Sequence, residues 1–196
     1  MKAGVPLLAP LLRSNAQGDI LALLFMNPDD EFSISDIQRR VGAQLATVHR
    51  EVGRLVDAEI ARDRQAGRAR LVRANMAHEL APPLAELLLR SYGPRVVLEP
   101  LVAALPGVRE AFIYGSWAAR YSGEPGPTPR DVDVLIVGTT PRDQLMMLGR
   151  AAQERLRREV NPTRVSPAEW DTGTSPFVAT VKAGPLVRLR DGGDEA

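Results

Sequence analysis

The stretch Ala111-Phe112-Ile113-Tyr114-Gly115-Ser116 and, after a loop, the stretch Asp131-Val132-Asp133-Val134-Leu135-Ile136-Val137-Gly138 decide the architecture of the second half of the chain. Each contains an apolar run typical of a buried strand. A Gly-Ser pair ends the first stretch, and two acidic residues open the second. Because successive side chains of a strand alternate between its faces, we expect Asp131 and Asp133 on one face.

These polar positions predict a phosphate site beside a metal site. Two carboxylates this close raise each other's pKa unless a cation or positive side chains neutralise them. Carboxylate oxygens suit Mg²⁺ or Mn²⁺, and Mg²⁺ takes its remaining ligands from water and substrate phosphates. Gly115 allows a ligand to approach the backbone, and Ser116 offers a hydroxyl and an N–H to a phosphate oxygen. In the alternative interpretation, Asp131 and Asp133 only form a solvated strand entrance.

The pattern Gly115-Ser116-x-x-x-Arg120, followed by Asp131-x-Asp133 at the head of an apolar strand, resembles the signature of the minimal nucleotidyltransferases of the polymerase-beta superfamily. The resemblance covers about residues 108–165. It implies a mixed sheet flanked by helices and metal-dependent transfer of a nucleoside monophosphate. It also implies Asp131 and Asp133 as catalytic and metal-binding residues, with Gly115 and Ser116 binding the nucleotide.

The chain departs from this family pattern on the next core strand, which we predict over residues 159–165. Catalytic members usually carry a third carboxylate there, and this chain has Asn161. Glu159 shares the strand face and could substitute. Without a third carboxylate the second metal has fewer ligands, and an attacking hydroxyl has no obvious base. Asn161 therefore favours a nucleotide sensor, whereas the Asp131-x-Asp133 pair favours an enzyme.

Composition restricts the class of protein without deciding it. The 196 residues are 44% hydrophobic, enough for one good core or two small ones, and the net charge is +1. The chain has no cysteine, which fits a reducing cytoplasm, and no apolar run approaches the ~18 residues of a membrane span. We interpret residues 1–12 as an N-terminal arm and expect residues 191–196 to be disordered.

The first half of the chain predicts two helices joined by a tight turn. After a short buried helix over 18–26, an extended piece over 31–34 leads to a helix capped by Ser35 that runs to Val41. Gly42-Ala43 makes the turn to a helix over 44–58. Its expected buried stripe comprises Leu45, Val48, Val52, Leu55 and Val56, and its opposite face carries Thr47, Arg50, Glu51 and Arg54.

A basic hairpin follows, with strands over 60–64 and 68–73. This order of elements resembles the winged helix-turn-helix domains of small bacterial repressors. Residues 33–75 hold nine arginines, no lysine and five acids, an excess that fits a DNA-binding face. A domain of this kind can instead serve only dimerisation or protein docking. The residues expected to contact DNA are Gln44, Thr47, Arg50, Arg54, Arg68 and Arg70.

The rest of the chain is helical with one irregular loop. A helix begins at Pro82-Pro83, a second covers 94–105, and the Gly- and Pro-rich loop over 121–130 is a candidate substrate gate. Arg120 and Arg130 flank this loop and could contact a triphosphate. A helix over 140–158 follows, and its outer face, expected to be solvated, carries Arg150, Arg155, Arg157 and Arg158.

We therefore expect an α+β protein with an N-terminal winged helix domain (14–75), a helical connector (76–93) and a C-terminal nucleotidyltransferase-like mixed sheet flanked by helices (94–190). The connector helices could join the domains, form a homodimer seam or cover the second sheet. The expected partners are a nucleoside triphosphate, double-stranded DNA and a toxin-like protein acceptor, with no membrane. The family contains antitoxins that transfer AMP to a toxin. The alternative is a transcriptional regulator whose transferase-like domain only senses a nucleotide, and a third possibility is an interaction scaffold with neither activity.

Overall fold

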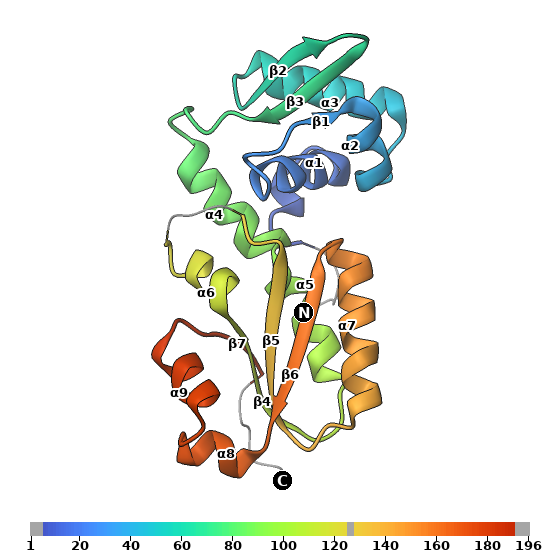
Figure 1. Cartoon of the computed structure of the whole chain (residues 1–196). Coiled ribbons are helices and arrows are strands. Elements are labelled where there is room, and N and C mark those ends of the chain that lie inside the picture. The colour runs from blue at the N-terminus through green and yellow to red at the C-terminus, as the bar shows by residue number, and fades with distance from the viewer. Residues whose placement is uncertain (1–5, 125–127, 191–196) are drawn as a thin grey trace. The chain divides into compact units, whose positions relative to one another are not determined.

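A computed structural model describes residues 6–124 and 128–190 (Figure 1). Part of the proposed gating loop, the beginning of the N-terminal arm and the whole C-terminal tail therefore lie outside the described residues. The expected mixture of helices and strands is confirmed, with two separate sheets. The chain divides into two compact units, one up to Gly93 and one from Pro94 onward. No helix of the described ranges is long and apolar enough to cross a membrane.

The first unit combines helices with a small antiparallel sheet in the strand order β1-β3-β2. In β2 and β3 the hairpin register pairs Ala61 with Ala74 and Ala66 with Ala69, so the first strand runs two residues further toward the turn than predicted and the second begins one residue later. The elements are a 3₁₀ turn Ala9–Leu11, α1 Asn15–Phe25, β1 Phe32–Ser33, α2 Ile34–Val41, α3 Leu45–Asp57, β2 Ala61–Ala66, β3 Ala69–Ala74 and α4 Ala81–Tyr92.

Local hydrogen bonds fix the α2–α3 pair. The cap of α2 is Ser33 rather than the predicted Ser35: its Oγ accepts from Asp36 N at 3.1 Å, and Asp36 Oδ2 accepts from Ser33 N at 3.3 Å. Ser33 and Asp36 therefore form a reciprocal capping box, and Ser35 lies inside the helix that Ser33 caps. Gly42 ends α2 with φ of 72°, a left-handed conformation that favours glycine.

One apolar core holds the first unit together. Ile20 and Leu24 of α1, Ile37 of α2 and Val48 of α3 are fully buried in it. Helix α4 adds Leu88 to the same core. The helix that we expected to act as a connector is therefore packed into the first unit, where it lies against α1.

The second unit is built on a mixed sheet of order β6-β5-β4-β7. Strand β5 runs parallel to β6 and antiparallel to β4, and β7 pairs with β4 antiparallel. The elements are α5 Pro94–Ala103, β4 Val108–Tyr114, α6 Gly115–Tyr121, β5 Asp131–Gly138, α7 Arg142–Leu156, β6 Glu159–Val165, α8 Pro167–Thr172, α9 Pro176–Ala183 and β7 Val187–Arg190.

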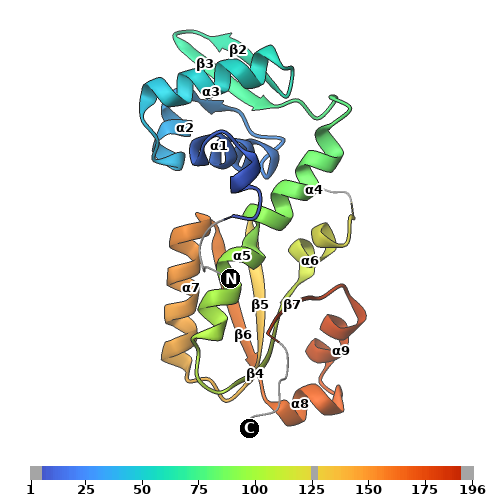
Figure 2. The same cartoon turned by 180° about the vertical axis from the view of Figure 1, so that it is seen from behind.

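Helices cover both faces of this sheet. On one face Trp170 of α8 and Val178 of α9 pack against Phe112 of β4 and Leu135 of β5. Helices α5 and α7 lie on the other face, which Figure 2 shows toward the viewer. Helix α6, which begins directly at Gly115, was not predicted, because the loop signal of the residues that follow obscured it.

Candidate functional site

The turn from β4 into α6 brings bare backbone to the carboxylates of β5. Gly115 has φ of 68°, so the turn takes the left-handed conformation that glycine adopts without strain. A Cβ at this position would lie 3.1 Å from Asp133 Oδ2. The carboxylate of Asp133 therefore lies against the turn itself, and Gly115 and Ser116 are both exposed beside it.

Strand pairing sets the positions of the acidic residues. Asp133 lies opposite Tyr114 of β4 and beside Asn161 of β6, and Asp131 lies beside Glu159. Asp131 and Asp133 leave the same face of β5, because they are two residues apart. Asp131 is exposed and Asp133 is partly buried.

Asn161 lies next to both carboxylates. Its amide Nδ2 donates a hydrogen bond to Asp131 Oδ2 at 3.2 Å. The pKa of Asp133 is raised above its usual range, first by burial and then by the negative charge of Asp131, and a hydrogen bond from Asn161 partly opposes this. Burial, followed by the charge of Asp133, also raises the pKa of Tyr114. The site is thus a negatively charged, partly desolvated corner with one amide donor.

The described residues contain no cluster of three or more acidic, histidine or cysteine side chains that could hold a metal ion. Glu159 is exposed at the start of β6 and does not join Asp131 and Asp133 in such a cluster. The suggestion that Glu159 replaces the third carboxylate therefore has no support in the geometry. A metal at this corner would take only two carboxylates from the described chain.

Two arginines were expected near the loop. Arg120, in the last turn of α6, is partly buried, and its Nη1 donates to the carbonyl oxygen of Glu124 at 3.4 Å. Arg130 is exposed immediately before Asp131. Arg120 is therefore held by the beginning of the loop, whereas Arg130 is presented at the entrance of β5.

Arg158 makes two contacts that the sequence pattern does not predict. The expectation of a solvated helix face was wrong for this residue: its Nη1 donates to the carbonyl oxygen of Pro129 at 2.7 Å, and its guanidinium lies 5.4 Å from the ring centroid of Trp117. Helix α7 ends at Leu156, and Arg157 takes φ of 51°, so helical periodicity no longer applies to Arg158. Arg158 thereby joins the residues just before β5 to α6.

In the first unit, α3 carries most of the residues expected to bind DNA. Gln44 occupies the N-cap position without a side-chain capping hydrogen bond and is exposed, Thr47 is partly exposed, and Arg50 and Arg54 are exposed. Two expectations for this helix were wrong: Leu45, expected in the buried stripe, is 46% exposed, and Glu51, expected on the opposite face, is only 2% exposed.

Glu51 links the two arginines of this helix. Its Oε1 accepts from Arg54 Nη1 at 3.0 Å and lies 3.5 Å from Arg50 Nε. Its Oε2 is buried and has no hydrogen-bond partner within the described part of the chain. A buried carboxylate with one satisfied oxygen depends on its positive partners, so Arg50 and Arg54 have a structural role as well as an exposed position.

The arginines of the β2–β3 hairpin differ from one another in whether they pair with a carboxylate. Arg70 Nε donates to Asp63 Oδ2 at 2.6 Å, and Arg64 Nε donates to Glu31 Oε1 at 2.9 Å. Arg68 is exposed at the tip and makes no ion pair with any carboxylate in residues 6–124 or 128–190. Of the two hairpin residues expected to bind DNA, Arg68 is available, and Arg70 would first have to leave Asp63.

No protein-family model matches this chain, and a search of curated proteins found no match.

Proposed function

We propose that the chain is a DNA-binding protein whose second unit is a minimal nucleotidyltransferase domain. In this proposal it transfers a nucleoside monophosphate from a nucleoside triphosphate to a protein or small-molecule acceptor, using Mg²⁺ or Mn²⁺. The observation that carries the proposal is the contact between the Gly115 turn and the carboxylate of Asp133, with Asp131 on the same strand face. A mixed sheet with helices on both faces also supports it.

The residues at this corner fit a Mg²⁺ ion that keeps part of its water shell. Asp131 and Asp133 supply hard oxygen ligands, and a cation here would stabilise the charged form of Asp133, whose pKa is raised by burial and then by the charge of Asp131. When bound, the ion would supply neutralisation of the triphosphate and of the charge that develops during transfer.

The chain's own contribution is to position the triphosphate. The absence of a side chain at Gly115 leaves backbone open to a phosphate, and the exposed Ser116 adds a hydroxyl donor. Arg120 places a positive charge at the base of the loop. The acceptor hydroxyl then attacks the α-phosphorus, an oxygen–phosphorus bond forms, the bond to pyrophosphate breaks, and the hydroxyl proton passes to water.

The DNA-binding part of the proposal rests on the first unit. Two helices joined at Gly42, followed by an arginine-rich antiparallel hairpin, have the order of a winged helix. Exposed Arg50 and Arg54 on α3 and Arg68 on the hairpin offer guanidinium groups for phosphates and base edges.

Asn161 favours a second candidate, a regulator that senses a nucleotide without transferring it. The amide of Asn161 is bonded to Asp131 at the place where a third carboxylate would be needed. An amide cannot accept the acceptor's proton as a carboxylate does. In this candidate Asp131, Asp133 and Gly115 bind nucleotide and metal, and DNA binding by the first unit is the output.

Titration calorimetry with ATP, in Mg²⁺ and in chelator, tests the nucleotide site. We expect much tighter binding in Mg²⁺, because bare carboxylates repel a triphosphate. The Asp131→Asn/Asp133→Asn variant should lose this metal dependence, and the neighbouring Glu159→Gln should retain it. Equal affinity with and without metal in wild type would remove the metal site.

Radiolabelled triphosphate then separates the enzyme from the sensor. The enzyme releases pyrophosphate or labels an acceptor, and the activity disappears in Asp133→Asn. Metal-dependent nucleotide binding without any transfer, across a panel of acceptors, would instead support the sensor.

A further inference from the structure

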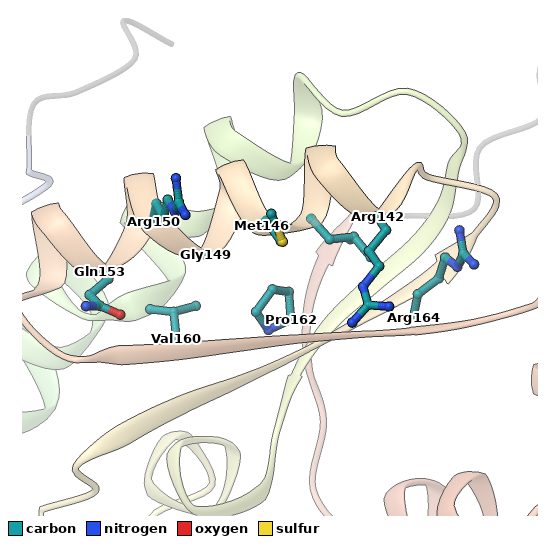
Figure 3. A pocket seen from close by; sticks show the side chains of 9 residues that line it. Arg142, Met146, Gly149, Arg150, Gln153, Val160, Pro162 and Arg164 are labelled. Carbon is teal, nitrogen blue, oxygen red and sulfur yellow. The ribbon is translucent and has the colours of Figure 1, made fainter.

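A pocket lies in the same unit as the carboxylates, on the opposite face of β6 from them. It is a hollow of about 550 Å³ between helix α7 and the edge strand β6 (Figure 3). The β6 residues that line it are Val160, Pro162 and Arg164. They alternate with Asn161, so they leave the other face of the strand. The pocket therefore shares no side chain with the Asp131–Asp133 corner.

Arginine is the dominant polar group of this pocket. Arg142 and Arg150 come from α7, and Arg164 comes from β6. None of the three makes an ion pair with a carboxylate in the described ranges, and no acidic residue is among the nine that line the pocket. Arg164 is oriented by its Nη1, which donates to the carbonyl oxygen of Thr140 at 2.6 Å.

Helical spacing places the α7 residues of the pocket on one side of the helix. Arg142, Met146, Gly149, Arg150 and Gln153 recur at intervals of three and four residues, so they form one stripe along α7. Figure 3 shows this stripe following the edge of β6, with the Arg142 side chain reaching toward the strand. At Gly149 an added Cβ would lie 3.4 Å from both Pro162 Cδ and the Val160 carbonyl oxygen. These are ordinary contact distances, so helix α7 lies directly against β6 at this point.

The rest of the lining is apolar. Leu145 and Val160 are buried, whereas Met146 remains 53% exposed beside Pro162. An exposed methionine and a proline offer a surface on which a flat or apolar group can lie. The pocket thus presents positive charges next to an apolar wall.

We propose that this pocket binds a small phosphorylated ligand with an apolar body, of the class of a nucleoside monophosphate. A phosphate monoester carries about −1.5 to −2 charges near neutral pH, which matches several unpaired guanidinium groups better than a single carboxylate does. The volume lies within the ~300–1,000 Å³ range of small-molecule sites. The site is separate from the triphosphate site, and its occupancy does not require the proposed transfer reaction.

AMP is the probe, and titration calorimetry in chelator is the measurement, because the carboxylate corner repels phosphate when no metal is present. Wild type should bind AMP saturably, and Asp131→Asn/Asp133→Asn should bind it equally well. Arg142→Gln/Arg150→Gln should weaken binding at least about tenfold, since a charge-assisted hydrogen bond is worth that much or more. Both substituted residues are exposed on α7, so the variant should fold.

The matched control is Arg155→Gln/Arg157→Asn, which removes the same charge from exposed positions outside the pocket. Asparagine is chosen at position 157 because it tolerates the positive φ found there. It should bind AMP as wild type does. For the apolar wall, Met146→Ser should weaken AMP but not inorganic phosphate, and Met147→Ser, which changes a 61% exposed methionine outside the pocket, should change neither.

Three outcomes would overturn the proposal. Wild type that binds neither AMP nor phosphate in chelator has no such site. Equal weakening in the control variant would reduce the effect to overall charge. Binding of a single-stranded oligonucleotide without binding of AMP would make the pocket a nucleic-acid contact.

Discussion

The amide of Asn161 donates to the carboxylate of Asp131 across the parallel strands β6 and β5, with Nδ2 and Oδ2 3.2 Å apart. This hydrogen bond holds an uncharged group beside two acids. Replacing the amide by a carboxylate of nearly the same shape would put three negative charges at one corner. The stability of this variant would therefore depend on a bound cation more than that of wild type does.

The first prediction therefore concerns Asn161→Asp. In chelator its melting temperature should fall below that of wild type, because repulsion replaces a hydrogen bond. Added Mg²⁺ should raise the melting temperature more in the variant than in wild type, and transfer activity should increase if the third carboxylate limits it. Glu159→Gln serves as the control. A melting temperature of Asn161→Asp that does not respond to Mg²⁺ would argue against any metal at this corner.

The second prediction follows from the raised pKa of Asp133. The folded protein holds this proton more tightly than the unfolded chain does, so stability falls as pH rises from the ordinary carboxyl pKa through the folded one. Above that window the destabilisation is fully present. In chelator, Asp133→Asn should therefore be more stable than wild type at neutral pH, and the difference should shrink toward pH 4.

Chemical denaturation at the two pH values measures this effect. The comparison needs Asp131→Asn beside it, because Asp131 is exposed but its charge contributes to the raised pKa of Asp133. Asp131→Asn should therefore give a smaller gain with the same pH trend. If wild type gains stability relative to Asp133→Asn as pH rises, the carboxylate is not destabilised by burial.

The third prediction uses two glycines with the same backbone requirement. Gly115 and Gly123 both have positive φ, 68° and 84°, so alanine at either position should cost about 1–2 kcal/mol of stability. Only at Gly115 would the new Cβ approach a side chain, Asp133 Oδ2 at 3.1 Å, whereas nothing lies within 4 Å at Gly123. Gly115→Ala should therefore also lose metal-dependent ATP binding, and Gly123→Ala should keep it. Equal ATP affinity in the two variants would show that the turn does not contact the nucleotide.

The elements of this fold were largely predictable because their signals are local. Apolar runs, helical spacing and proline starts predict the strands over 108–114 and 131–138 and the helix of residues 142–156 to within a few residues. The pairing of Asp131 and Asp133 on one face follows from strand geometry alone. The position of Asn161 was expected only from the family resemblance, and the strand register places it beside Asp133.

The failures occurred where periodicity stops or where a tertiary contact overrides it. Arg158 lies beyond the end of α7, so the assignment to a helix face did not apply. Glu51 has the spacing of an exposed residue but is buried, since Arg50 and Arg54 provide charge partners that a one-dimensional pattern cannot reveal. The pocket between α7 and β6 depends on the distance between these two elements, and sequence spacing does not encode that distance.

The last prediction concerns DNA binding and must separate contact from stability. Arg54→Ala should weaken duplex binding, but it also removes the hydrogen-bond donor of the buried Glu51 carboxylate, which should cost about 1–3 kcal/mol. The double variant Glu51→Gln/Arg54→Ala should recover stability, because no buried charge is left unpaired. If Arg54 touches DNA, the double variant should still bind weakly.

Arg68→Ala is the matched comparison, since Arg68 is exposed and makes no ion pair with any carboxylate of the described residues. It should leave stability unchanged and reduce the salt dependence of duplex binding by about one phosphate contact.

A variant that lacks a base-reading residue should also lose discrimination between DNA sequences, by about 1–3 kcal/mol per contact, which competition binding at fixed salt measures. Duplex affinity that is unchanged in Arg50→Ala/Arg54→Ala at fixed salt would exclude α3 as the reading helix. Full recovery of DNA binding in Glu51→Gln/Arg54→Ala would instead give Arg54 a purely structural role, because only the loss of its pairing with Glu51 would then explain the weaker binding of Arg54→Ala.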